Sequence, residues 1–553
     1  MSNEVETLNA IRSLSELTVP PGEIIMRVHF VPMEQTMRQG QVPDEKEIAK
    51  ALKGFSINLL KIYPRSFCFT NGLFYGLIRT PEGKRLAVFG DKGLVLADPF
   101  RGNCFHAAST LKLCDPSPEN TECLMTFFPY TKPVPLLKQP FTTIGTGDRL
   151  GIATPGHLRA IRKFRSRPIL AQQSVRENNQ TGRNFHDVVQ DAAWGVFQEN
   201  YRHGYGADGD HLKSFHEIKT ALDAGVSMVT LDLSEKLNPM AFHDSWTSIN
   251  AQFKEEIDEG DAKVLSHLFL ERSFDLKGPD GERHIRFTEE SLKRNALLYQ
   301  KAIDFTEEVY EWIRSEKGYR TTLDFEISID ETPFPTSPEN HLFFIIALSH
   351  RGVRIDSLAP RFIGDFQKGI DYRGDLKAFR EQFYRHCLIA QHYGNYKISI
   401  HSGSDKFSVF PDIGKLAADA VHLKTAGTSW LEAMRLVSQK APALYREMHE
   451  FALSAFKDAA KLYHVTTDLG RIPELERLKD HELPELLERE DSRQLLHITF
   501  GYLLNAKDSK GQILFKDRFY SILTQCEEDY WSLLERHIGN HLMSLGVEKG
   551  EAG

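Results

Sequence analysis

Apolar and polar residues alternate most clearly in two stretches of the chain, 322–330 and 396–402. In the first, phenylalanine and isoleucine alternate with aspartate, glutamate and serine. In the second, two isoleucines alternate with Lys397, Ser399 and His401. A period of two over apolar, β-branched residues predicts strands. The second stretch then continues as Ser-Gly-Ser-Asp-Lys, which is typical of a loop that follows a strand of an α/β barrel.

Six further runs of the same kind predict strands, and helical patterns separate most of them. The eight expected strands are 142–148, 169–174, 205–211, 227–233, 322–330, 353–357, 397–402 and 420–425. Parallel strands need a long crossover, usually a helix. Eight such units favour a closed (β/α)₈ TIM-type barrel over an open, doubly wound sheet. The fold class expected from the sequence is therefore α/β.

The alternation also predicts which residues face the barrel interior. The outward set, packed on the helices, is Val229, Leu231, Phe325, Ile327, Ile329, Val353, Ile355, Ile398, Ile400, Val421 and Leu423. The inward set is Thr230, Asp232, Glu326, Arg354, Asp356, Ser399, His401, His422 and Lys424. Buried charges are costly unless they are paired or bind something. The strand ends are therefore the expected functional site.

The rest of the chain divides around this barrel. Residues 1–22 are expected to be a flexible lead-in, and 23–140 a small N-terminal α/β domain of no identifiable chemistry. The barrel is expected at 141–430, with a charged, mostly helical insertion at 234–318. A helical C-terminal region follows at 431–553, and its acidic stretch near 473–491 is expected to be solvated surface.

Composition narrows the function classes. The formal net charge of −8 argues against nucleic acid as a partner. The sequence contains no run of about 18 apolar residues, so no membrane span is expected. The acidic N-terminus is unlike a secretory signal, so a cytoplasmic location is expected. Six cysteines without a CxxC pair suggest free thiols. Four of them fall between 68 and 123, which keeps a metal knuckle as the lesser alternative.

Three histidines at or near strand ends, His211, His401 and His422, predict an open site for a divalent metal. Imidazole ligands suit zinc, nickel, iron or cobalt more than magnesium or calcium, and the sequence does not distinguish among Zn, Ni, Mn, Co and Fe. The alternative for each histidine is a hydrogen-bonded place in a polar core.

Among the many carboxylates at the strand ends, Asp210 and Glu326 are the expected acid/base pair. Asp210 adjoins His211, so strict strand parity would send one of the two side chains outward. The pair requires the strand to end or turn at that point. The alternative for most of these acids is an ion pair with a neighbouring basic residue.

Further polar residues in the same strands and loops are expected to bind substrate. Lys213, Lys397 and Lys424 are candidates for an anionic carboxylate or phosphate. The other expected contacts are Asp148, Arg149, Gln173, Arg176, Ser402 and Asp405. The segment Gly145-Thr146-Gly147-Asp148-Arg149-Leu150-Gly151 has the spacing GxGxxxG, so we interpret it as a tight barrel loop, with nucleotide binding as the lesser alternative.

Several long segments, in order, resemble those of the tagaturonate/fructuronate epimerases, a family that includes tagatose 4-epimerases. They are 144–151 (IGTGDRLG), 171–177 (AQQSVRE), 204–211 (GYGADGDH), 324–331 (DFEISIDE), 362–364 with 368–375 (FIG and KGIDYRGD), 401–408 (HSGSDKFS) and 421–429 (VHLKTAGTS). The resemblance covers about 60–545. The departures are the region before about 60 and Gly209, where relatives tend to carry alanine.

The resemblance implies a metal-dependent sugar epimerase that acts on a sugar acid or a ketohexose. D-tagaturonate and D-fructuronate differ at a carbon one removed from both the ketone and the carboxylate, so enolisation alone cannot interconvert them. Retro-aldol cleavage, rotation and re-addition would do so, with a carboxylate moving the proton. Transient oxidation by a nicotinamide is the rival route.

Two other classes remain open. One is a metal-dependent aldolase (a lyase), which would release the two fragments. A lid that retains the fragments would favour the epimerase, and the 234–318 insertion is a candidate for such a lid. The other is a non-catalytic sugar-acid binding protein. A homo-oligomer is compatible with the sequence.

Overall fold

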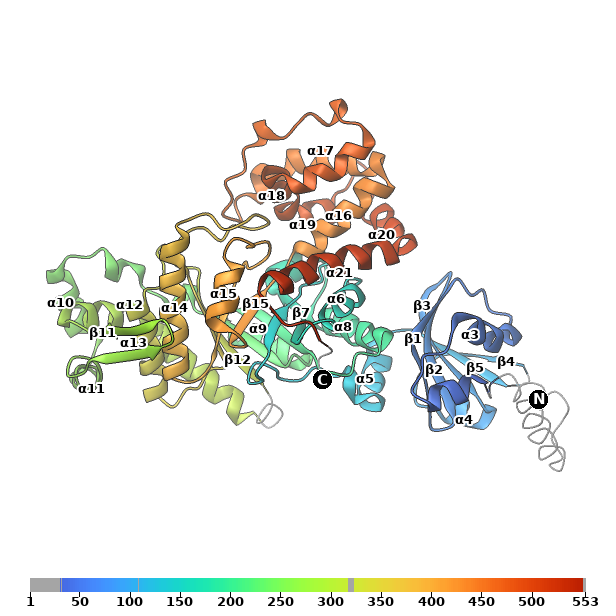
Figure 1. The fold of residues 1–553 in the computed structure, drawn as a ribbon, viewed down its shortest axis with the longest axis horizontal. Helices are drawn as coiled ribbons and strands as arrows, with labels where there is room; N and C mark the ends of the chain where they lie inside the picture. The colour runs from blue at the N-terminus through green and yellow to red at the C-terminus, as the bar shows by residue number, and fades with distance from the viewer. Residues whose placement is uncertain (1–29, 31, 108, 317–322, 551–553) are drawn as a thin grey trace. The chain divides into compact units, whose positions relative to one another are not determined.

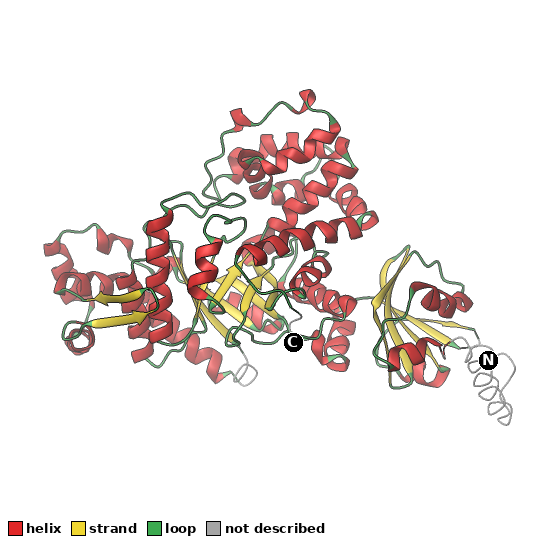
Figure 2. Cartoon of the chain, viewed as in Figure 1, coloured by secondary structure: helices red, strands yellow, loops and turns green. Residues whose placement is uncertain are grey.

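The computed structural model describes residues 30, 32–107, 109–316 and 323–550 of the 553-residue chain. It contains two compact units (Figures 1 and 2). The first comprises the chain up to Lys132 together with Ala193–Arg202, and the second comprises Pro133–Ala192 and His203–Gly553. The expected lead-in at 1–22 lies outside the described residues.

The first unit is built on a five-stranded antiparallel sheet in the order β1-β2-β3-β5-β4. The strands are β1 (Lys61–Thr70), β2 (Leu73–Thr80), β3 (Gly83–Gly90), β4 (Asn103–His106) and β5 (Thr110–Cys114). Asn71 and Gly72 connect β1 to β2 with φ of 52° and 78°. Asn-Gly is the preferred pair for such a two-residue turn, because both positions need positive φ.

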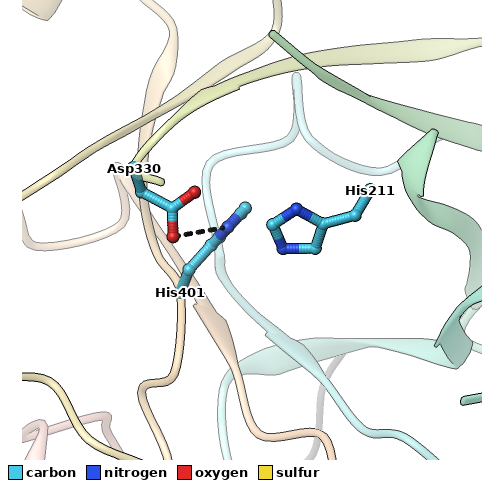
Figure 3. Close-up of side chains that lie close together, drawn as sticks. All are labelled: His211, Asp330 and His401. Atoms are coloured by element: carbon cyan, nitrogen blue, oxygen red, sulfur yellow. Dashed lines mark ion pairs between the residues drawn. The ribbon is translucent and has the colours of Figure 1, made fainter. Parts of the chain in front are cut away.

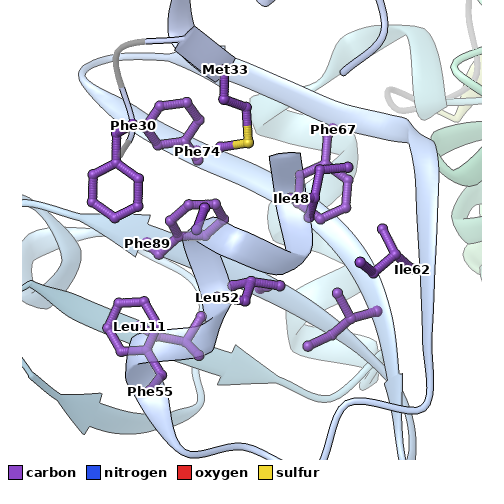
Figure 4. Packing of buried hydrophobic residues seen from close by; sticks show 13 residues of the cluster. Phe30, Met33, Ile48, Leu52, Phe55, Ile62, Phe67, Phe74, Phe89 and Leu111 are labelled. Atoms are coloured by element: carbon purple, nitrogen blue, oxygen red, sulfur yellow. The ribbon is translucent and has the colours of Figure 1, made fainter. Parts of the chain in front are cut away.

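Helix α3 (Glu45–Leu52) covers one side of this sheet and supplies much of its core (Figure 4). A capping box between Asp44 and Glu47 starts the helix. Its buried residues Ile48 and Leu52 belong to a cluster with phenylalanines of the sheet. Helices α4 (Lys92–Ala97) and α5 (Pro118–Phe127) are further helices of this region.

The second unit contains the expected closed barrel of eight parallel strands, which confirms the predicted fold class. The strands follow one another around the barrel in the order β12-β13-β14-β15-β6-β7-β8-β9. They are β6 (Thr142–Gly145), β7 (Ser166–Ser174), β8 (Gly206–Leu212), β9 (Met228–Asp232), β12 (Asp324–Ile329), β13 (Ser357–Pro360), β14 (Lys397–Ile400) and β15 (Val421–Lys424). Crossover helices are α6 (Thr154–Ile161), α7 (Val175–Thr181), α8 (Phe185–Glu199), α9 (Phe215–Asp223), α12 (Glu289–Ser315), α13 (Pro338–His350), α14 (Leu376–His392) and α15 (Phe410–Ala417).

The expected sixth strand is wrong in position, because the strand runs over Ser357–Pro360 rather than 353–357. Arg354 and Asp356 therefore precede the strand and are not inward-facing strand residues. The Asp356 carboxylate instead accepts a hydrogen bond from the Phe325 backbone N–H at 3.0 Å. The residues that lead into this strand alternate between apolar and polar as strand residues do. The alternation therefore did not show where the strand begins.

Two barrel strands are irregular at the level of the site. In β8, His211 has φ of 53°, and the pairing with β9 shifts register between Gly209 and Leu212. In β7, Ala171 has φ of 56°, and the pairing with β8 shifts beside it. Each irregularity reverses the simple alternation of side chains that a flat strand imposes.

The 234–318 insertion is mostly helical, as expected, and also contains an antiparallel hairpin that the sequence analysis did not foresee. Its elements include α10 (Trp246–Glu256), α11 (Glu259–Phe269), β10 (Phe274–Gly278) and β11 (Gly281–Ile285), followed by α12. The segment 317–322, at its end and at the start of the expected fifth strand, lies outside the described residues.

The C-terminal region is helical, as expected. It comprises α16 (Thr428–Lys440), α17 (Pro442–Ala459), η7 (Asp480–Glu488), α18 (Glu490–Ile498), α19 (Phe500–Asn505), α20 (Lys516–Gln525) and α21 (Glu527–Ser544). Helix α21 packs against α6 and α16. The acidic stretch near 473–491 is only partly solvated surface, because η7 buries Leu483, Leu486 and Leu487.

The six cysteines are free thiols, and none of the four between 68 and 123 belongs to a potential metal-ligand group of the described residues. No helix in the described part of the chain is both long and apolar enough to cross a membrane.

Candidate active site

A cavity of about 470 Å³ lies at the carboxyl ends of the barrel strands, within the usual size range of small-ligand sites. Residues from β7, β8, β13, β15 and α7 line it, together with the loops that follow β6, β12, β13, β14 and β15 and a C-terminal segment. The charged and histidine residues of its lining are Arg149, Arg176, Glu177, Asp210, His211, Asp330, Glu331, Arg361, Asp365, Lys368, His401, Lys424 and His464.

The Lys424 ammonium is surrounded by carboxylates beneath this cavity. Its Nζ lies 2.9 Å from Asp208 Oδ2, 2.7 Å from Asp210 Oδ1 and 2.8 Å from Glu326 Oε1. Thr230 Oγ1 is 2.7 Å from the same nitrogen. Strand β15 is hydrogen-bonded only to β14 and β6, so these contacts to β8, β9 and β12 cross the barrel interior. We call Asp208, Asp210 and Glu326 around Lys424 the acid cage.

The acid cage separates the proton affinities of its members. Burial raises the pKa of Asp208 to about 6, although Lys424 opposes the shift. Burial would also raise the pKa of Asp210, but Lys424 and the two nearby histidines hold it below its usual range. Two neighbouring carboxyl groups with pKa values pushed apart are a common arrangement for acid/base chemistry. Asp210 is the one that lines the cavity.

His211, Asp330 and His401 meet at the strand ends (Figure 3). One potential ligand atom from each lies within 4.8 Å of the others. The two imidazole rings stand 4.8 Å apart, edge to face. The left-handed backbone at His211 lets both Asp210 and His211 reach the cavity, which resolves the parity conflict in the sequence.

A buried carboxylate orients each imidazole. His211 Nδ1 lies 3.0 Å from Asp232 Oδ2, and His401 Nε2 lies 2.8 Å from Glu326 Oε1. His401 Nδ1 lies 3.3 Å from Asp330 Oδ2. Each ring thus has one nitrogen held from behind, and its second nitrogen remains for the shared space. Metal-binding histidines typically have this carboxylate support.

The charge balance at this group favours a cation. Burial would lower the pKa of His211, but Asp210, Asp232 and Asp330 raise it to about 10. The pKa of His401 is also raised, because Asp330 and Glu326 outweigh burial and the Lys424 charge. Carboxylates that stabilise protonated imidazoles would stabilise a bound cation in the same way. The donor set of two imidazole nitrogens and one carboxylate oxygen fits a first-row divalent metal with open positions.

The structure leaves His422 outside this group, although the sequence placed it with His211 and His401. His422 Nδ1 lies 3.0 Å from Thr143 Oγ1 in the barrel interior, and the residue does not line the cavity. Its Nε2 is buried with no hydrogen-bond partner in the described ranges. Burial lowers the pKa of this ring to about 3. His422 is thus a neutral imidazole below the site.

The loop after β6 is tight, as expected, and separates the roles of Asp148 and Arg149. The Asp148 carboxylate accepts hydrogen bonds from three backbone N–H groups of its own loop, those of Leu150, Gly151 and Ala153. Arg149 lines the cavity, but its guanidinium is paired with Glu177 at 2.7 Å and stacked on a phenylalanine ring. Asp148 therefore shapes the loop, and Arg149 is already neutralised.

The irregularity in β7 exchanges the roles of two glutamines. Gln172 lines the cavity and donates a hydrogen bond to Asp210 Oδ2 at 3.0 Å. Gln173, the expected contact, points to Asn178 and Arg183 instead. The sequence analysis missed Gln172, because an alternating pattern cannot reveal the left-handed residue Ala171 before it.

Of the remaining expected substrate contacts, Ser402 and Arg176 line the cavity. Lys213 does not line it and faces Asp232, Glu235 and Glu331 at 3.4–3.9 Å. Asp405 does not line it either, because its carboxylate is paired with Arg493 at 2.6 Å.

The sequence analysis also missed Lys368 and Arg361 in the β13–α14 loop and the C-terminal segment 462–464, all of which line the cavity. Lys368 opens the KGIDYRGD segment, so the motif signal was present although no role was assigned to it. None of the described residues of the 234–318 insertion, which end at residue 316, lines the cavity, so they do not form its lid in this structure.

Lys397 lies at the start of β14, 4% exposed, and its Nζ donates to the Phe141 carbonyl rather than reaching the cavity. Burial lowers its pKa to about 7, with Asp324 and Asp419 partly offsetting the shift. An unfolded lysine has a pKa of about 10.4. Between these values the unfolded state binds more protons, so this residue makes the wild type more stable as pH rises.

The Lys397→Met variant lacks this titration. We therefore expect the difference in unfolding free energy, variant minus wild type, to fall between about pH 6 and about pH 9. Denaturant unfolding of both proteins at the two pH values measures it. An unchanged difference would mean that Lys397 stays charged in the folded protein.

Comparison with known proteins places the chain among sugar-acid epimerases. The family model described as tagaturonate epimerase matches residues 63–545. A tagaturonate/fructuronate epimerase of Thermotoga maritima is 39% identical over 483 residues, which cover 87% of this chain and 96% of the relative.

Crystal structures of the fructuronate-tagaturonate epimerase from Cohnella laeviribosi, native and in complex with glycerol, are 43% identical in sequence to this chain. Each matches with a TM-score of 0.83 over 94% of this chain and 99% of the crystallised one.

Proposed function

This chain belongs to the tagaturonate epimerase family and is an isomerase, and we propose that it interconverts D-tagaturonate and D-fructuronate by metal-dependent epimerisation at C4. The observation that supports the proposal best is the meeting of His211, Asp330 and His401 in one cavity beside Asp210. A metal-ligand group and a proton-transfer carboxylate are the two components that the reaction requires.

The position of the inverted carbon decides which chemistry is available. C4 is separated by one carbon from the C2 ketone and by one carbon from the C6 carboxylate. Its hydrogen is therefore not acidic. Cleavage and re-formation of the C3–C4 bond is a route that needs only proton transfer at a hydroxyl group. We propose this retro-aldol route for the protein.

Asp210 is the residue that we assign to proton transfer. It lines the cavity and is held by Lys424 Nζ and Gln172 Nε2, at 2.7 and 3.0 Å. It accepts the proton of the C4 hydroxyl as the C3–C4 bond breaks, and the bonding electron pair becomes part of the three-carbon enediolate. The C4 aldehyde fragment rotates, the bond re-forms on its other face, and Asp210 returns the proton. No atom is gained or lost.

His211, Asp330 and His401 are the residues that would hold the metal. A divalent ion there would supply Lewis-acid polarisation of substrate oxygens. Asp232 and Glu326 would keep the two imidazoles oriented from behind. We therefore assign Glu326 to positioning His401, since its side chain is fully buried and does not line the cavity.

The same chemistry applies to neutral ketohexoses, so C4 epimerisation of tagatose and fructose is a second proposed activity. The carboxylate of the substrate takes no part in bond cleavage. The relative rates on sugar acids and neutral sugars therefore depend on binding rather than on the chemical step.

The test is an assay with D-tagaturonate, in which D-fructuronate is detected by chromatography. We expect a chelator to abolish turnover and a first-row divalent metal to restore it, because the cavity offers imidazole and carboxylate ligands. Elemental analysis of the purified protein provides the control. Full activity of protein verified as metal-free would refute the metal dependence, and release of free three-carbon products instead of fructuronate would identify a lyase.

A further inference from the structure

The basic residues of the cavity differ in whether they are already paired. Lys424 lies within the acid cage, and Arg149 is paired with Glu177. In contrast, no carboxylate of the described residues lies within ion-pair distance of Arg176, Arg361 or Lys368. These three cations remain available for an anionic ligand. Two of them, Arg176 and Lys368, lie near one another, and we call them the cationic pair.

The two members of the cationic pair come from distant parts of the barrel. Arg176 lies in the first turn of α7, directly after β7, and Lys368 lies in the loop between β13 and α14. Strands β7 and β13 are four positions apart in the closed barrel. Even so, Lys368 is within electrostatic reach of Arg176, Arg149 and Glu177. The β13–α14 loop therefore extends over the cavity toward α7.

This loop is held firmly where it carries Lys368. The Lys368 carbonyl accepts a hydrogen bond from Gln494 Nε2 at 3.3 Å, and the next carbonyl, that of Gly369, accepts one from Arg493 Nε at 2.7 Å. Buried Lys406 donates to the carbonyls of Gln367 and Ile370 on either side, at 2.8 and 2.6 Å. These bonds fix the backbone from which the Lys368 side chain extends toward the cavity.

Arg176 is exposed and contacts the C-terminal segment 462–464, which also lines the cavity. Its guanidinium lies 5.0 Å from the Tyr463 ring centroid and donates to the Leu462 carbonyl at 3.4 Å. Neither contact supplies a carboxylate, so its guanidinium has no ion-pair partner among the described residues. Burial lowers the pKa of Lys368, the Glu177 charge only partly offsets this, and Arg176 and Arg149 lower it further. An anion between the two cations would relieve their repulsion.

We propose that Lys368 and Arg176 bind the carboxylate of the sugar-acid substrate. This assignment rests on the proposed function and names the part of the site that distinguishes a uronate from a neutral ketose. Four basic residues that the sequence analysis named are unsuitable, because Lys424 and Arg149 are neutralised and Lys213 and Lys397 do not line the cavity.

The location also suits the proposed chemistry. Cleavage of the C3–C4 bond leaves the carboxylate on the aldehyde fragment, which must turn over before the bond re-forms. A fragment anchored by its carboxylate can rotate about the bonds between the anchor and the aldehyde without leaving the cavity. The cationic pair would therefore retain the fragment as well as recognise the substrate.

The test compares Lys368→Met with Lys368→Arg and with Lys377→Met, the same substitution at an exposed lysine outside the cavity. For D-tagaturonate we expect Lys368→Met to lower kcat/KM by about 10- to 100-fold, mainly through KM, the usual worth of one charged hydrogen bond. For D-tagatose, kcat/KM should be unchanged. Lys368→Arg should retain most of the activity, Lys377→Met should match the wild type, and metal content should be the same in all.

Calorimetry measures the binding of D-tagaturonate to two proteins, the slowly reacting Asp210→Asn variant and the same variant with Lys368→Met added. This comparison decides the question even if D-tagatose is not a substrate. Weaker binding after loss of Lys368 supports the carboxylate site. Equal binding, or an equal loss for both sugars in the kinetic assay, would overturn it. Failure of the wild type to convert D-tagaturonate would refute the proposed function instead, so the two failures are distinguishable.

Discussion

Replacing His401 by alanine is expected to abolish epimerisation and to remove the bound metal. His401 contributes one of three potential ligands, and it links Asp330 to Glu326 through its two nitrogens. Loss of even an outer-shell partner of a metal ligand costs about 10- to 100-fold in metal affinity, so loss of a ligand itself should cost more than about 100-fold. Metal content by elemental analysis and turnover of D-tagaturonate measure both effects.

The matched control is His422→Gln. His422 lies on β15 and faces the barrel interior, but it contacts Thr143 rather than the cavity. Glutamine keeps a polar group beside Thr143, and we expect this variant to keep its metal. The reverse outcome, with metal lost from His422→Gln and kept by His401→Ala, would show that the group of His211, Asp330 and His401 is not the metal site.

Replacing Asp210 by asparagine is expected to lower kcat by about 10²- to 10⁴-fold with no change in metal content, since this range is the usual worth of proton transfer. The single amide oxygen can still accept from Lys424, and the amide NH2 then faces Gln172 in place of the second carboxylate oxygen, but the amide cannot exchange a proton. Asp210 is not among the three proposed ligands. Steady-state kinetics at saturating substrate, with metal analysis of the same samples, measure the effect.

Glu326→Gln separates proton transfer from positioning. Glu326 lies behind His401, 2.8 Å from its Nε2, so we expect a lower metal affinity and an activity that added metal restores. Added metal should not restore Asp210→Asn. If instead Glu326→Gln binds metal fully and is inactive while Asp210→Asn is nearly normal, the two carboxylates have the opposite roles.

The sequence by itself determined the barrel, because its periodic pattern follows from local geometry. Alternation of apolar and polar residues, with helices between, predicted the parallel closed sheet. Lys424 and Glu326, which the alternation turned inward, do meet across the barrel. The motif order also led to the epimerase family. These inferences needed only that successive side chains on a strand point to opposite faces.

Only the tertiary structure decided which of these residues act together. The left-handed backbone at Ala171 and His211 turned Gln172 and the Asp210–His211 pair into the cavity, and alternation has no means of showing such a reversal. The sequence made Lys424 a candidate to bind an anionic substrate group. In the structure its charge is neutralised by the carboxylates of the acid cage. His401 follows β14 directly, whereas His422 lies within β15 and pairs in register with Ser399, two residues before His401, so His422 lies deeper in the barrel. The pattern within one strand does not show this register between strands. Lys368 reaches the site through a loop whose course is set by contacts with α18, more than a hundred residues later in the chain.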